Sequence, residues 1–545
     1  MSASETEAEP SEGEPPERRR RPLPFHPILL AAFPVLHLFR TNLHEVTTGQ
    51  ALGPLGIVAG GAAVLLALAW LVLRDIRRAG LLVSLIVLLF FSYGYVADAF
   101  EDWEIAGVSV GRDRYVLVLW GVLAIGGGYL LLRIRKALPD VTTILNGVSL
   151  ILVLTTAVPI VADKIGGSEK VAAPLPSVVP TTREPINAKR DIYYVNFDRY
   201  GGEDSLGPYF DYDNRPFLTS LEQKGFIVAH HARANYPNTG HSLSSMLNMT
   251  FLDGVAKEVG PSSENDWRPL YGLIKKNEVS RFLKSQGYRY VHIGSWFEAT
   301  RTNALADETI SYDPLSEFSR SLLETTPLEP LSNALGIGGS TLDPRRVAWA
   351  RVLFQLEQMV RVGNDGKPTF VFAHIIMPHQ PYVFERDGSF LDAGLMKRRH
   401  WHRNYLEGLQ FANTMMTRIA DRLLAGPDKS DPIIIFASDE GPPPGNDASA
   451  TNPDPEAWIS KTSRQLRQKF PILSALYLPG VKDPGIPQDI TPVNFFRAVF
   501  SLYFGADLPL LPDKSYVWQD LDHLYDFTEI TDQVAGPQTV AAGTS

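Results

Sequence analysis

The sequence of 545 residues contains no cysteine. This excludes disulfide bonds, thiolate metal sites and a cysteine nucleophile. Basic residues are outnumbered as well, since 51 lysines and arginines stand against 60 aspartates and glutamates, giving a net charge of -9. The acidic excess argues against nucleic acid as a general partner. The sequence also lacks an internal repeat and a heptad array, so neither a repeat protein nor a coiled coil is expected.

Most long apolar runs lie before residue 163. There are five of them: Phe25–Phe39, Ala51–Leu73, Ala79–Ala97, Tyr115–Leu132 and Val141–Val161. The last four have about 18 to 23 residues, which is enough to cross roughly 30 Å of hydrocarbon. The first is short and by length alone could be an interfacial helix. We therefore predict about five transmembrane helices within residues 25–163.

The charges of the loops between these apolar runs predict how the helices are oriented in the membrane. The loop from Asp98 to Arg114 is acidic, whereas two other loops are basic, with Arg74, Arg77 and Arg78 in one and Arg133, Arg135 and Lys136 in the other. By the positive-inside rule the basic loops are cytoplasmic. The prediction is thus a multi-pass protein of the plasma membrane, in contact with the lipid bilayer, whose part after Val161 lies outside the cytoplasm.

The remainder of the chain predicts one large α/β domain. Residues 1–24 and 528–545 have compositions typical of disordered tails, and residues 164–190 are typical of an extended, proline-containing linker. Between residues 191 and 527, short apolar strands alternate with helical patterns such as Arg346–Val360, Trp401–Leu424 and Val493–Tyr503. This alternation favours a mainly parallel central sheet.

Two of the predicted strands run directly into acidic residues. The run Asp191–Phe197 stops at Asp198, and the run Pro432–Ala437 is followed by Asp439, Glu440 and a glycine. In open α/β sheets ligands bind at the carboxyl ends of the strands, so the two ends are interpreted as one site. The alternative is that each aspartate merely caps the turn or helix that follows.

A hydroxyl-rich segment between these strands offers a nucleophile. Tyr-Pro-Asn reads as a turn, and Ser242 to Asn248 reads as the start of a helix, which places Thr239 just before or at a helix N-terminus. Backbone N–H groups and the helix dipole stabilise an anion there. A threonine hydroxyl at this point could attack phosphorus or sulfur. The alternative is that Thr239 or Ser242 is a simple N-cap.

Two further strand ends carry groups that could contact a substrate. His379 stands between two prolines after the strand Thr369–Ile376, where an imidazole can bind a phosphoryl oxygen or protonate a leaving group. Trp296 and Arg301 follow the strand Tyr288–Ile293, and Arg301 could hold an anion or be a solvated surface residue. His374 lies inside its strand and is interpreted as a hydrogen-bonded core histidine.

These motifs together resemble the alkaline phosphatase superfamily, and in particular its membrane-anchored, sulfatase-like branch of lipoteichoic acid synthases and phosphoethanolamine transferases. The resemblance implies a metal bound by a strand-end acid, a nucleophilic threonine and a late Asp-His pair. The matching positions are Asp198, Thr239 and Asp439, with Glu440 where the family usually has histidine. By the same resemblance, His379 is the substrate-binding histidine of the His-x-Pro-Tyr loop.

Two departures from the family pattern refine this prediction. With Glu440 in place of histidine the metal shell is all oxygen, which favours Mg²⁺, Mn²⁺ or Ca²⁺ over Zn²⁺. The extra carboxylate adds negative charge that repels an anionic substrate. No Cys or Ser occupies a Cys/Ser-x-Pro-x-Arg pattern, which the resemblance associates with formylglycine, so sulfate ester hydrolysis by that route is excluded.

The leading hypothesis is a metal-dependent phosphoryl-group transferase or phosphodiesterase, a sulfatase-like hydrolase or transferase that acts on a lipid- or glycan-linked phosphate through a covalent Thr239 intermediate. The first alternative is a catalytically silent sulfatase-like domain used for binding in the cell envelope. A transporter is the second alternative, but the five apolar segments carry no ionisable residue near their centres to mark a polar pathway.

Overall fold

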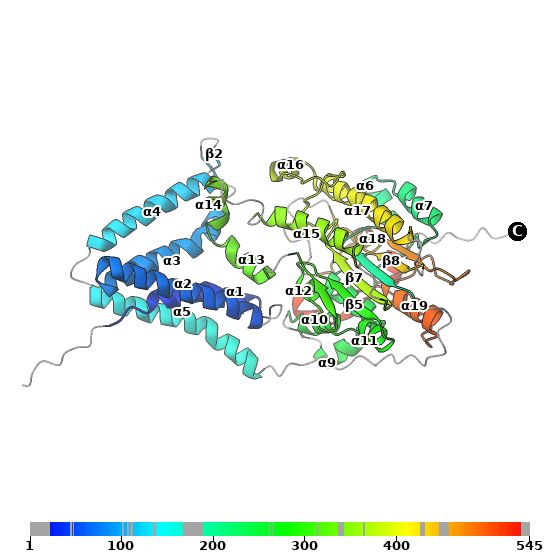
Figure 1. Ribbon diagram of the computed structural model, residues 1–545, viewed down its shortest axis with the longest axis horizontal. Helices are drawn as coiled ribbons and strands as arrows, with labels where there is room; N and C mark the ends of the chain where they lie inside the picture. The colour runs from blue at the N-terminus through cyan, green and yellow to red at the C-terminus, as the bar shows by residue number, and fades with distance from the viewer. Residues whose placement is uncertain are drawn as a thin grey trace, which may run out of the picture. The chain divides into compact units, whose positions relative to one another are not determined.

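The computed structural model describes most of the chain, in two compact units (Figure 1). One unit comprises Met1–Arg40, Leu52–Ile160 and Thr325–Pro330, and the other Thr41–Ala51, Val161–Glu324 and Leu331–Ser545. The described residues are 22–43, 46, 48–100, 103–105, 108–109, 113–133, 138–166, 189–260, 262–263, 265–312, 315–335, 343–362, 366–425, 431–445 and 457–535. Most of the predicted tails and linker lie outside these residues.

The N-terminal apolar runs form five helices and one short hairpin. The helices are α1 (His26–Thr41), α2 (Thr48–Leu73), α3 (Ile76–Ala99), α4 (Asp113–Arg133) and α5 (Leu138–Gly166), and the hairpin is β1 (Glu104–Ile105) with β2 (Val108–Ser109). Among the described residues, four helices, α2 to α5, are long and apolar enough to cross a membrane. The prediction of about five included the short first run, which forms α1, and its 16 residues span about 24 Å.

The second unit is built on a seven-stranded sheet. Its strand order is β4 (Ile227–Val228), β9 (Ser474–Tyr477), β8 (Ile433–Ala437), β3 (Ile192–Phe197), β7 (Thr369–Ile375), β5 (Arg289–Ile293) and β6 (Glu308–Ile310). Strands β8, β3, β7, β5 and β6 pair in parallel, while β9 pairs antiparallel with both of its neighbours. The predicted mainly parallel α/β sheet is confirmed.

Helices cover both faces of this sheet, as the alternation of residues along β3 requires. Ile192 and Tyr194 pack in one core with helices α8 (Thr239–Asn248), α10 (Arg268–Lys275), α11 (Glu278–Ser285) and α19 (Phe495–Phe504). Tyr193, Val195 and Phe197 pack in the other core with α6 (Glu203–Phe210), α7 (Arg215–Gln223), α15 (Pro344–Met359) and α17 (Trp401–Leu424). A strand buried on both faces reads as a continuous apolar run, which is why it could be found in the sequence.

Shorter elements complete this unit. They are α9 (Asp253–Val259), α12 (Glu298–Arg301), α13 (Glu317–Glu324), α16 (Ala393–Arg398), α18 (Ser463–Lys469), α20 (Thr531–Val534), the 3₁₀ turns η1 (Pro492–Asn494) and η2 (Leu521–His523), and a hairpin of β10 (Tyr516–Trp518) and β11 (Phe527–Glu529). One further helix, α14 (Leu328–Leu335), has residues in both units. The predicted helix bounds were close. Helix α15 starts two residues before the predicted Arg346, because the Asp343 side chain caps it and a proline takes its first position.

Candidate metal and nucleophile site

Three adjacent parallel strands bring the site together. Asp198 follows β3 directly, Asp439 lies two residues beyond β8, and His374 is the penultimate residue of β7. Asn196 of β3 pairs with His374 on one side and with Ala437 on the other, which places all three groups at the carboxyl end of the sheet. The backbone N–H of Asp198 continues the ladder by donating to the Ile375 carbonyl at 2.9 Å.

The three side chains form a cluster of the size that one cation fills. One ligand atom from each of Asp198, His374 and Asp439 lies within 4.8 Å of the others. His374 Nε2 is 3.4 Å from Asp198 Oδ2. Asp198 Oδ1 and both Asp439 carboxylate oxygens are buried without a well-formed hydrogen bond from any described residue. Because buried carboxylates are costly without partners, this set of two carboxylates and one imidazole fits a divalent metal.

The buried ionisable groups of the cluster shift one another's pKa values. Burial raises the pKa of Asp198, but the charges of His379, His374 and Arg199, with the His374 hydrogen bond, outweigh burial and hold that pKa below its usual value. Burial lowers the pKa of His374, but the hydrogen bond and charge of Asp198, aided by the more distant carboxylates, bring it above its usual value. The two groups therefore stabilise each other's charged forms.

The pKa of Asp439 shifts in the opposite direction to that of Asp198. Burial, followed by the charge of Asp198, raises the pKa of Asp439 to about 6. His374, Thr239 and Asn196 partly oppose this shift. Two carboxylates at one site cannot both ionise easily without a cation between them, so a bound cation would lower the pKa of Asp439.

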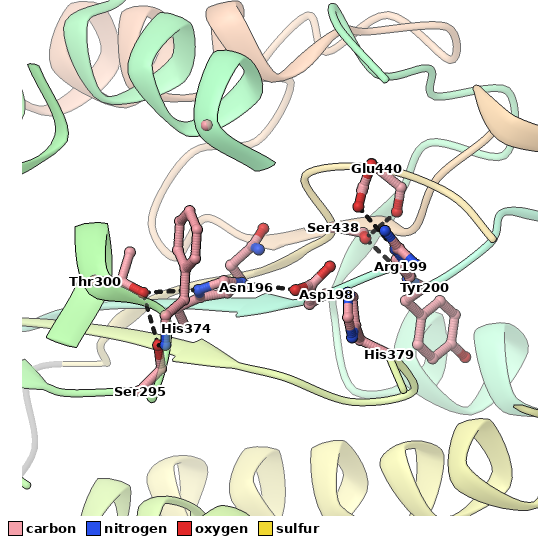
Figure 2. Close-up of polar contacts among 12 residues, drawn as sticks. Asn196, Asp198, Arg199, Tyr200, Ser295, Thr300, His374, His379, Ser438 and Glu440 are labelled. Carbon is pink, nitrogen blue, oxygen red and sulfur yellow. Dashed lines mark hydrogen bonds and ion pairs between the residues drawn. The ribbon is translucent and has the colours of Figure 1, made fainter. Parts of the chain in front are cut away.

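A chain of hydrogen bonds fixes the ring of His374. Its Nδ1 lies 2.9 Å from Thr300 Oγ1, and that hydroxyl lies 2.8 Å from Ser295 Oγ (Figure 2). The main-chain carbonyl of His374 accepts a bond of 3.1 Å from the Gln355 side chain. With Nδ1 engaged, Nε2 is the nitrogen directed at Asp198, as a metal-binding histidine requires.

Thr239 is the first residue of α8, as the sequence predicted. Asn238 is the N-cap of this helix, and its side chain accepts from the Gly240 N–H at 2.9 Å. Ser242 instead donates its hydroxyl to the Tyr236 carbonyl at 2.8 Å. The alternative that Thr239 or Ser242 is the N-cap is therefore wrong. Thr239 is 8% exposed, and its hydroxyl lies close enough to Asp439 to lower the pKa of that carboxyl.

Glu440 does not join the cluster of Asp198, His374 and Asp439. Its Oε1 lies 2.9 Å from Arg199 Nε and its Oε2 lies 2.6 Å from Lys469 Nζ, in a fully buried ion pair (Figure 2 shows the Arg199 contact). Its predicted role as a metal ligand is therefore not the one that this geometry favours. The physical reason is that two buried cations already neutralise its carboxylate.

The predicted substrate-contacting residues lie in part beside the cluster. The ring of His379 is next to Asp198 in Figure 2, and its charge acts on the pKa of that carboxyl. His379 Nδ1 bonds the Gln380 carbonyl, and the rings of Trp296 and His379 meet edge to face at 6.2 Å. Arg301 ends α12 and is partly buried. The roles of these residues toward a substrate stay predictions.

His374 is the site residue that the sequence analysis assigned only to the core. A signal for it exists in the alternation of β7, because Phe370, Phe372 and His374 share one face of the strand. Tyr194 of β3 stacks on Phe372 at 5.2 Å, so that face is shared with Asn196 and leads toward α8, which carries Thr239. A polar residue at the end of such an apolar face is a candidate ligand.

A comparison with models of known protein families gives a match within the part of the chain that contains the sheet. The model described as Sulfatase matches residues 203–502, which is more than half of the chain. This match confirms the resemblance to sulfatase-like proteins that the sequence motifs indicated. A search of curated proteins gave no match.

Similar solved structures include a periplasmic domain, an integral membrane protein and a lipoteichoic acid synthase. The periplasmic domain of EcEptC from Escherichia coli has 13% identity and a TM-score of 0.41, covering 65% of this chain and 96% of its own. The integral membrane lipooligosaccharide phosphoethanolamine transferase A of Neisseria meningitidis has 11% identity and a TM-score of 0.38, covering 88% and 95%. The lipoteichoic acid synthase LtaP of Listeria monocytogenes has 14% identity and a TM-score of 0.38, covering 63% and 82%.

Proposed function

The chain belongs to the sulfatase family, and from that premise we propose that it is a membrane-anchored, metal-dependent phosphoryl-group transferase or phosphodiesterase acting outside the cytoplasm on a lipid- or glycan-linked phosphate. The observation that carries the proposal is the pair of buried carboxylates, Asp198 and Asp439, whose oxygens lie beside His374 and next to a threonine at a helix N-terminus.

In this proposal Asp198, Asp439 and His374 hold one divalent metal, with the Thr239 hydroxyl as a further ligand. A bound metal of this kind lowers the pKa of a coordinated hydroxyl and offsets charge on phosphoryl oxygens. The expectation of an all-oxygen shell depended on Glu440. With an imidazole nitrogen in its place, Zn²⁺ is as well suited to the donor set as Mn²⁺, and Mg²⁺ is less suited.

Thr239 is the proposed nucleophile. Its Oγ1 forms a bond to phosphorus while the bond from phosphorus to the leaving oxygen breaks, and the threonine proton passes to solvent. The first N–H groups of α8 and the helix dipole favour the negative charge that the phosphoryl group brings there. An acceptor hydroxyl or water then attacks the same phosphorus and releases Thr239.

His379 is proposed to assist the leaving group or to orient the substrate. Its Nδ1–H donates to the Gln380 carbonyl, and the proposal assigns proton exchange with the leaving oxygen to Nε2. Trp296, whose ring meets that of His379, and Arg301 are proposed to contact the rest of the substrate. Tethering in the bilayer through α2 to α5 raises the effective concentration of a lipid-linked substrate.

Mass spectrometry of Thr239 tests this function. The purified full chain, in lipid nanodiscs with a divalent metal, is incubated with candidate phospholipids and digested. We expect a phosphorylated or phosphodiester-modified peptide containing Thr239, lost in Thr239→Ala and after treatment with a chelator. Ser242→Ala is the matched control, because Ser242 is on the same helix and bonds the Tyr236 carbonyl. An unmodified Thr239 with every lipid and no turnover would favour the silent envelope-binding domain.

A further inference from the structure

The ion pair of Glu440 has a cation on each carboxylate oxygen. Arg199 and Lys469 lie 2.9 and 2.6 Å away, and all three side chains are at most 3% exposed. Lys469 Nζ also donates to the Gly441 carbonyl at 3.0 Å and lies 5.5 Å from the centre of the Trp458 ring. A buried carboxylate with two such partners is held in place, since turning it away would leave two buried cations without their counter-ion.

The chain loop that carries Glu440 is packed just as tightly. The Gly441 N–H donates to the Lys469 carbonyl at 2.9 Å, and a Cβ built on Gly441 would lie 2.2 Å from that oxygen. Ser438 Oγ donates to the Glu440 carbonyl at 2.7 Å and accepts from the Tyr200 N–H at 3.0 Å. The backbone as well as the side chain therefore keeps Glu440 on the Arg199 and Lys469 side.

The formal charges around the site show what these two cations change. Asp198, Asp439 and Glu440 contribute three negative charges, and Arg199 and Lys469 contribute two positive charges. Counting these groups, with His374 neutral as a metal ligand, the balance is plus one with a divalent metal, before Thr239 loses its proton. Without the two cations, the metal-loaded site would carry minus one and would repel a phosphate anion. The chain as a whole has a net charge of -9, so the long-range field does not supply this attraction.

We propose that Arg199 and Lys469 are positioning residues that keep Glu440 out of the metal shell and leave the metal-loaded site with a net positive charge, so that it binds an anionic phosphate group. This inference rests on the proposed function and deepens it. It places Glu440 in a buried cluster of one carboxylate and two cations, which carries a net charge of plus one.

Anion binding by the full chain tests the proposal. Metal content is measured by mass spectrometry, and inorganic phosphate binding to the Mn²⁺-loaded protein is measured by calorimetry. Lys469→Met makes the loaded site neutral, so phosphate affinity should fall about 10-fold or more while metal affinity rises. Lys469→Arg keeps the charge and should stay near wild type. Equal loss in both variants would mean a purely structural lysine and would overturn the proposal.

A double variant distinguishes an effect of the net charge at the site from a role of Glu440 as a metal ligand. Glu440→Gln with Lys469→Met restores the charge balance of the wild type, so it should bind one metal and recover phosphate affinity to within about threefold. Loss of the metal in this variant would make Glu440 a ligand and overturn the proposal, and this variant carries the test if Lys469→Met alone does not fold. A wild-type chain that binds neither metal nor phosphate would instead refute the proposed function itself.

Discussion

His374 Nε2 lies 3.4 Å from Asp198 Oδ2, across the neighbouring strands β7 and β3. Each group holds the other in its charged form, and the ring is fixed from behind by the Thr300 hydroxyl at 2.9 Å. His374 would give up its proton on binding the proposed metal, because only the neutral imidazole ligates. The contact therefore holds the two side chains in place for the metal that we propose.

Replacing His374 should weaken metal binding selectively. His374→Asn removes the nitrogen ligand, and we expect metal affinity to fall by about 100-fold or more, measured by competition with a chromogenic chelator. His292→Asn is the matched control, because His292 is equally buried on the next strand, β5, and its Nε2 donates to the Thr300 carbonyl at 2.8 Å. Equal losses in the two variants would contradict the assignment of His374 as a ligand.

The raised pKa of Asp439, about 6, predicts that the metal site costs stability when it is empty. The unfolded pKa is near 3.9, so the folded state favours the protonated form, and this stabilising contribution is present below pH 4 and lost as pH rises through 6. At pH 7.5 the chelator-treated Asp439→Asn variant should be more stable than wild type, by on the order of 2–3 kcal/mol.

Denaturant unfolding of the full chain in detergent, repeated from pH 4 to 8, measures this difference. The gap between Asp439→Asn and wild type should close as pH falls toward 4. With metal present the order should reverse, because wild type alone gains the binding free energy. A variant less stable than metal-free wild type at pH 7.5 would refute the argument.

Much of the site could be predicted because short local patterns in the sequence indicate strands and turns. Asp198 and Asp439 stand at the ends of apolar runs that are buried on both faces, and Thr239 follows a Tyr-Pro-Asn turn. Glu440 could not be placed in this way, because its partner Lys469 lies 29 positions later and looks like an ordinary lysine at the end of a helix. Only the fold shows that this lysine is buried. His374 was assigned to the core because a single strand does not reveal which groups face it from β3.

Gly441 should tolerate no side chain. Its Cβ would lie 2.2 Å from the Lys469 carbonyl oxygen, a backbone atom that cannot move alone, so Gly441→Ala should cost about 2–4 kcal/mol of unfolding free energy. Gly272→Ala is the matched control, because Gly272 lies inside α10 with nothing within 4 Å of its Cβ position. That variant should be unchanged or more stable by up to about 1 kcal/mol, since alanine favours the helix. Chemical unfolding of both variants measures the contrast, and equal stability would contradict the tight packing of this loop.

The absence of cysteine makes the orientation of the chain directly testable. A single cysteine at Lys482, an exposed residue of the sheet-containing unit, should react with a membrane-impermeant maleimide in intact cells. A single cysteine at Arg133, at the end of α4 in a basic loop, should react only after the cells are lysed, because the positive-inside rule places that loop in the cytoplasm. Both variants keep the apolar helices intact, so labelling reports topology alone. Labelling of Arg133→Cys but not Lys482→Cys in intact cells would invert the topology and place the proposed site in the cytoplasm, where a substrate on the outer leaflet is out of reach.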